Sequence, residues 1–121
     1  MHIKFLPHGS GDASRAAKYV MAEHDHLGIQ RGHVELIQGD LEMFSMVANS
    51  LPFKNRYTSG VISWAETDKP TEEQMAAVLA DMEKTMFAGL EPEDYIFCAI
   101  RHDDHIHVLS ANCQLSSGLS F

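Results

Sequence analysis

The sequence YIFCAIRHDDHIHVLSANC, residues 95–113, contains two apolar runs separated by a short polar bend. Both runs are rich in β-branched, aromatic and small apolar residues, a composition typical of buried strands. If Asp103-Asp104 is a two-residue turn, the runs pair as a β-hairpin and His102 lies directly opposite His105. We therefore predict that these residues form two neighbouring antiparallel strands.

The rest of the chain alternates strand and helix patterns. The clearest helix start is a capping box, with Thr71 at the cap and Gln74 three residues later. Asp12 or Ser14 can cap an earlier helix. The order βαβαβαββ predicts an α+β fold, an antiparallel or mixed five-stranded sheet with about three helices packed on it. We expect strands at Ile3–Leu6, His33–Ile37, Tyr57–Trp64, Tyr95–Arg101 and Ile106–Cys113, and helices at about 12–23, 41–49 and 71–89.

The length and composition of the chain restrict its class. Its 121 residues are enough for one domain with one core, and 45% hydrophobic with 21% charged residues is ordinary for a globular protein. No apolar run approaches the 18 or so residues of a membrane helix. Cys98 and Cys113 do not form a CxxC spacing, so we interpret them as reduced core thiols of a cytoplasmic protein.

The charge is unevenly distributed along the chain. The net charge of −8 argues against a nucleic-acid partner, because phosphate binding depends on Lys and Arg. However, residues 1–60 carry six basic and six acidic groups, whereas residues 61–121 carry three basic and eleven acidic groups. The acidic charge therefore weakens a DNA-binding hypothesis without removing it.

Three histidines converge at the predicted bend. His102 and His105 share one face of the hairpin, and His107 returns to that face two residues further along the strand. Three nitrogen ligands with open positions suit a catalytic divalent ion. Asp103 or Asp104 can hold a ring N–H behind the ligands. The alternative is that these are solvated histidines of an exposed turn.

Several stretches resemble the HUH endonucleases, and in particular the MobA-type plasmid mobilisation relaxases of colicin-type plasmids. His105-Ile106-His107 matches their His–hydrophobe–His motif, and the resemblance extends over nearly the whole chain. The most specific parts are the tyrosine in the first helix and the Tyr-Thr-Ser-Gly-Val segment. The matching stretches are IKF (3–5), AKYV (17–20), IQGD (37–40), LPFKNRYTSGV (51–61) and FAGL (87–90).

The resemblance implies a site-specific endonuclease that nicks single-stranded DNA at a plasmid transfer origin and so initiates conjugative mobilisation. In such relaxases a tyrosine of the first helix attacks a phosphodiester and becomes linked to the 5′ phosphate. Carried over to this sequence, the nucleophile is Tyr19, and His102, His105 and His107 hold a divalent metal ion, Mg²⁺ or Mn²⁺ in the first place, with Zn²⁺ and Ni²⁺ as alternatives. Asp104 would support these ligands from behind. All three tyrosines precede the His-x-His motif, the order of relaxases rather than of rolling-circle initiators.

Two features depart from the family pattern. Colicin-type relaxases commonly use His, Glu and Asn as ligands, and their domains continue well beyond this motif. The resemblance thus implies that residues 1–121 form a single relaxase-like nuclease domain truncated at its C-terminal end. Three basic residues are our candidates for phosphate contacts, because they lie near Tyr19 or within the family-like segment: Lys18, Lys54 and Arg56.

Three functions remain open from the sequence. The first is the metal-dependent nickase, and the second is a truncated relaxase-like module that binds metal, DNA or both without cleavage. The third is an inert α+β domain. The partners implied are single-stranded DNA and accessory mobilisation proteins, and exposed sheet edges leave an oligomer open.

Overall fold

A computed structural model describes residues 1–6, 9, 11–21, 34–52, 54–65, 67–102 and 105–116. Its elements follow the predicted order, with one short 3₁₀ helix, η1, added before the last two strands. They are β1 (His2–Phe5), α1 (Ala13–Met21), β2 (Val34–Gln38), α2 (Leu41–Ser50), β3 (Tyr57–Ser63), α3 (Glu72–Met86), η1 (Pro92–Asp94), β4 (Phe97–His102) and β5 (His105–Ala111).

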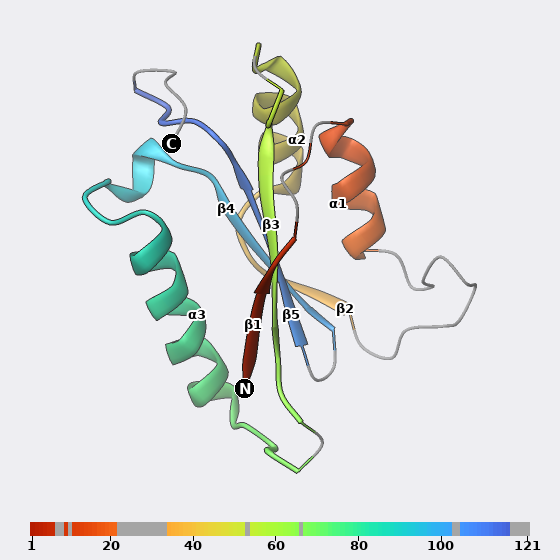
Figure 1. Ribbon diagram of the computed structural model, residues 1–121, viewed down its shortest axis with the longest axis vertical. Helices are drawn as coiled ribbons and strands as arrows, with labels where there is room; N and C mark the ends of the chain where they lie inside the picture. Colours follow the sequence, from red (N-terminus) through yellow and green to blue (C-terminus); the bar gives the residue numbers. More distant parts are fainter. Residues whose placement is uncertain are drawn as a thin grey trace.

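The five strands form one antiparallel sheet in the order β1-β3-β5-β4-β2. The α+β prediction is confirmed, and every strand pair is antiparallel rather than mixed. β5 lies at the centre, while β1 and β2 are the edges. Figure 1 shows α3 on one side of the sheet and α1 and α2 on the other. We call these the α3 face and the α1/α2 face.

Each face of the sheet has its own apolar core. Alternation along the strands sends Ile100 and Leu109 into the cluster under α1 and α2, while Ile106 and Val108 join the cluster under α3. The two central strands, β4 and β5, are therefore buried from both sides. The same alternation puts His105 and His107, which flank Ile106, on the α1/α2 face.

Local capping determines where two of the helices begin. The predicted capping box is present at α3, where the Thr71 side chain accepts from the Gln74 N–H and the Gln74 side chain accepts from the Thr71 N–H. At α1 the Ser14 N–H donates to Asp12 Oδ1, so Asp12 is the cap of the two candidates. A hydrogen bond from Asn49 of α2 is the main cause that holds the pKa of Asp12 below its usual range. This contact joins the start of α1 to the end of α2.

The prediction that both cysteines are core thiols is confirmed, and two tyrosines also pack against aromatic rings. Cys98 and Cys113 are buried free thiols. Tyr57 packs edge-on against Phe44, and Tyr95 stacks on Phe87. The predicted extension of the first helix beyond Met21 and the start of the second strand at His33 lie outside the described residues. Within the described part of the chain, no helix has the length and apolar character needed to cross a membrane.

Candidate metal centre

The β4–β5 hairpin brings three histidines together. His102, the last residue of β4, pairs with His105, the first residue of β5, as the sequence predicts. His107 lies two residues further along β5 and on the same face of the sheet. Asp103 and Asp104, including the predicted support of the ligands by Asp104, lie outside the described residues.

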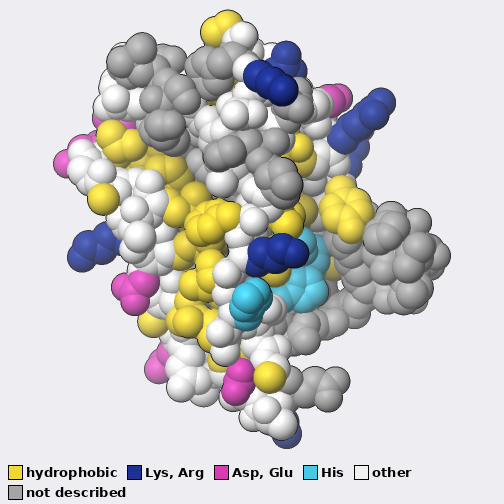
Figure 2. Space-filling view, in the orientation of Figure 1, with side chains coloured by type: hydrophobic (Ala, Val, Ile, Leu, Met, Phe, Trp, Pro, Cys, Tyr) yellow, Lys and Arg dark blue, Asp and Glu magenta, His cyan; other side chains and the backbone are white. Residues whose placement is uncertain are grey.

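The three imidazole rings form a compact cluster. The ring centroids of His102 and His107 are 4.6 Å apart, and each is 5.2 Å from the centroid of His105. One ring nitrogen from each residue lies within 4.8 Å of the others. Nitrogens bound to one tetrahedral ion at about 2.1 Å would be about 3.4 Å apart, which is the same order as the spacing in this cluster. His102 is buried, whereas the other two rings are half-exposed. In Figure 2 histidine side chains, drawn in cyan, reach the surface near the middle of the face in view.

His102 is also bonded to the first helix. Its Nε2 lies within hydrogen-bond distance of the backbone carbonyl oxygen of Val20 in α1. A carbonyl oxygen only accepts, so Nε2 carries the hydrogen and Nδ1 carries the lone pair of the neutral ring. Metal-ligating histidines commonly donate their second N–H to a backbone carbonyl in this way, which fixes the tautomer and the ring orientation. The donor set and this hydrogen bond therefore fit a metal ion held by three histidines.

Tyr19 precedes Val20 in α1 and does not belong to the buried side of that helix. Ala13, Ala17 and Val20 face the core, while Tyr19 is 44% exposed. The same turn of α1 thus provides a carbonyl to His102 and an accessible tyrosine beside it. The structure brings the helix that carries the predicted nucleophile against the predicted metal ligands.

The predicted phosphate contacts lie in two parts of the fold. Lys18 is exposed on α1, and Lys54 and half-buried Arg56 precede β3. In β3 the residue opposite His107 is Val61, five positions after Arg56, which corresponds to about 17 Å along the strand. The structure therefore does not bring Lys54 and Arg56 to the histidine cluster, and their contact with DNA stays a prediction for more distant nucleotides.

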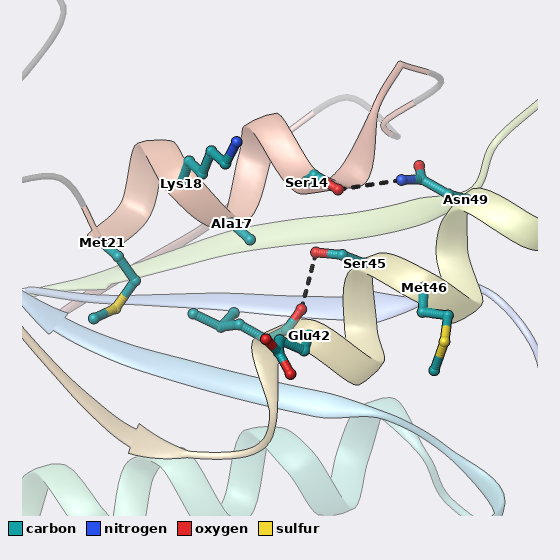
Figure 3. Close-up of a pocket in the computed structure, with 9 residues that line it drawn as sticks. Ser14, Ala17, Lys18, Met21, Glu42, Ser45, Met46 and Asn49 are labelled. Carbon is teal, nitrogen blue, oxygen red and sulfur yellow. Dashed lines mark hydrogen bonds between the residues drawn. The ribbon is translucent and has the colours of Figure 1, made fainter.

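A separate cavity of about 500 Å³ lies between α1 and α2. Figure 3 shows Lys18 and Met21 on one wall and Met46 and Asn49 on the other. None of the three histidines lines this cavity. This cavity is thus a concave surface on α1 that is separate from the histidine cluster.

The Val20 carbonyl is the part of the site that sequence reasoning missed. A backbone oxygen has no residue type that could mark it in a sequence. The two bonded residues are 82 positions apart. Only the packing of α1 on the sheet shows that His102 has a partner in that helix.

Together, the fold and the site define an antiparallel α+β domain with a three-histidine cluster that can hold a metal ion. The chain is 28% identical over 122 residues to cryptic plasmid protein C of Neisseria gonorrhoeae, and 28% identical over 122 residues to the DNA relaxase MbeA of Escherichia coli. Both matches cover 98% of this chain, which spans 57% of the first relative and 23% of the second. No family model and no solved structure matches the chain. The relatives confirm the predicted relationship to plasmid mobilisation relaxases.

Proposed function

We propose that this chain is a metal-dependent, site-specific endonuclease that nicks single-stranded DNA at a plasmid transfer origin, with Tyr19 as nucleophile. The proposal extends to this chain the activity named for the relative MbeA, a DNA relaxase. Nicking at the origin would initiate mobilisation of the plasmid. The metal ligands in this proposal are His102, His105 and His107.

The reaction is a transesterification at phosphorus. The Tyr19 oxygen forms a bond to the phosphorus, and the 3′ oxygen of the preceding nucleotide leaves with the bonding electrons. The phenol proton is lost, and a proton reaches the 3′ oxygen. The product is a 5′-phosphotyrosine linkage with a free 3′ hydroxyl, and reversal rejoins the strand.

Phenol is a weak nucleophile at neutral pH because its ordinary pKa is about 10. A bound divalent cation would supply Lewis acidity toward the phosphate oxygens and so stabilise the charge that develops there. Mg²⁺ or Mn²⁺ fits this role in the proposal, and Zn²⁺ or Ni²⁺ fits the nitrogen ligands. The chain itself orients the ring of His102 through the Val20 carbonyl and presents Tyr19 from the adjacent position in α1.

The single observation that carries the proposal is the hydrogen bond between His102 and Val20. Many proteins have exposed tyrosines, and surface histidines are also common. Here the ligand cluster and the tyrosine-bearing helix are joined by a direct contact, with Tyr19 next to the bonded residue. This contact supports the proposal, because an attack by Tyr19 requires that its helix lie beside the ligands.

A second function is a relaxase-like module that binds metal or DNA without turnover. The observation that favours it is the small number of basic residues, nine Lys and Arg against seventeen Asp and Glu. A protein that makes few phosphate contacts binds single-stranded DNA with lower affinity. This module would show metal binding and no covalent product.

The test uses single-stranded oligonucleotides that tile a transfer origin, with Mn²⁺ or Mg²⁺ present. We expect a protein–DNA adduct that survives denaturation for the wild type and for Tyr57→Phe, a matched control whose ring packs on Phe44. Tyr19→Phe should give no adduct, with unchanged folding and unchanged metal affinity by calorimetry. Metal binding without any wild-type adduct would favour the binding module. An adduct that persists in Tyr19→Phe would assign the nucleophile elsewhere.

A further inference from the structure

The edge strand β1 lies beside the metal centre on the same face of the sheet. In the β1–β3 register Lys4 is opposite Val61, and in the β3–β5 register Val61 is opposite His107. Directly opposed residues of antiparallel strands point to the same face. Lys4, Val61 and His107 therefore form one row across three strands.

A second row lies next to the first. His2 is opposite Ser63, and Ser63 is opposite His105, which in turn is opposite His102. Both rows belong to the α1/α2 face. Each row begins at a residue of β1 and includes one or two of the proposed metal ligands.

The distance between Lys4 and His107, together with the length of the lysine side chain, suits a ligand that spans these two residues. Two strand spacings, about 10 Å, separate the backbone of Lys4 from that of His107. The four-carbon stem of lysine can cover part of that distance. Val61 and Ser63, half-buried and compact, form the floor between them. Lys4 itself is exposed, as is all of β1.

The surroundings make Lys4 a suitable anion contact. Acidic residues of α3, such as Glu72, Glu73 and Asp81, lie on the other side of the sheet, because α3 packs on the opposite face. Figure 2 shows Lys or Arg side chains exposed on the same side of the molecule as the histidines. Lys4 thus places a positive charge on the face of the sheet that carries the histidine cluster.

We propose that Lys4 binds a backbone phosphate of single-stranded DNA next to the phosphate held at the histidine cluster. This inference rests on the proposed function and adds a phosphate subsite on β1. Lys4 acts as a positioning residue. Its ammonium group contacts the phosphate backbone of the DNA. Lys4 therefore favours a polyanionic strand and does not discriminate between base sequences.

The experiment measures binding of fluorescent single-stranded oligonucleotides of two unrelated sequences, in Mn²⁺, over a range of salt concentrations. We expect Lys4→Gln to weaken binding about fivefold for both sequences and to lower the salt dependence by about 0.7 in the slope of log K against log salt. Lys4→Arg should keep both values close to those of the wild type. Lys84→Gln, which removes the same charge from an exposed position on α3, should also match the wild type.

The outcomes separate this inference from the proposed function. Equal affinities and slopes for Lys4→Gln and Lys84→Gln, with the wild type binding DNA, would overturn the role of Lys4 and leave the nickase proposal intact. A wild type that binds no single-stranded DNA would overturn both. Metal titration of each variant provides a further check, because the affinity for Mn²⁺ should not change in Lys4→Gln. A lowered Mn²⁺ affinity would show that Lys4 acts through the ligands and would refute a separate phosphate subsite.

Discussion

His102 should contribute to stability even when no metal is bound, unlike its two neighbours in the cluster. Its ring is 3% exposed and donates to the Val20 carbonyl, whereas His105 and His107 are half-exposed. In His102→Ala the carbonyl loses its buried partner, which costs about 1–3 kcal/mol, and the lost packing of the ring adds to this. We expect a total of about 2–4 kcal/mol for His102→Ala and less than about 1 kcal/mol for His105→Ala.

The assay is urea unfolding of the purified protein with a chelator present, so that metal makes no contribution. His102→Gln is the matched control, because its side-chain amide can still donate to the same carbonyl. It should regain at least half of the stability lost in His102→Ala. In a thermal scan, the gap between the two alanine variants corresponds to about 4 °C for each kcal/mol in a domain of this size.

Equal stabilities of His102→Ala and His105→Ala without metal would refute the reasoning. That result would mean that α1 does not depend on His102 for its position on the sheet. Addition of Mn²⁺ gives a second comparison, because the wild type should gain stability from a bound ligand and both alanine variants should gain less. A gain that is the same in all three would remove the histidine cluster as the binding site.

Further predictions concern the core and one turn. Burial raises the pKa of the Cys98 thiol to about 11, so Cys98 should resist thiol reagents at pH 8 until urea unfolds the protein, and rapid labelling of the native state would contradict this. Because the folded state holds that proton more tightly, the free energy of unfolding should fall as pH rises from about 9 towards 11, and Cys98→Ala should flatten this dependence in urea titrations. Gly39 has φ +92° and its missing Cβ would lie 2.4 Å from the Phe97 carbonyl oxygen, so Gly39→Ala should cost more than about 2 kcal/mol in urea unfolding. Gly11→Ala, whose Cβ would meet nothing within 4 Å, is the control, and a similar cost for both glycines would be evidence against this reading of the turn.

The parts of the fold that local physics decides could be predicted from the sequence. The Thr71–Gln74 capping box involves residues three positions apart, and the His102–His105 pair is separated by only two residues. Strand boundaries were less accurate. The sequence predicts the last strand from Ile106 to Cys113, whereas it runs from His105 to Ala111, because pairing with β3 decides where the ladder ends.

The candidate site likewise has parts that the sequence predicts and parts that only the tertiary structure decides. The convergence of the three histidines follows from strand alternation and a short bend. Tyr19 follows from the resemblance of the sequence to relaxases. Lys18 is predicted from its position beside Tyr19, and Lys54 and Arg56 are predicted from their place in the family-like segment. The structure places Lys54 and Arg56 before the start of β3, at the end of the sheet away from the cluster.

By itself, the sequence determined the α+β class, the order of the elements and the hairpin that gathers three imidazoles, because each depends on periodicity, caps and turns within a few residues. Tertiary structure alone decided that β1 lies two strands from His107 and that the carbonyl of Val20 meets His102. The residues involved are about 80 to 100 positions apart in the sequence. They come together only when burial of both sheet faces determines the strand order and the position of α1 on the sheet.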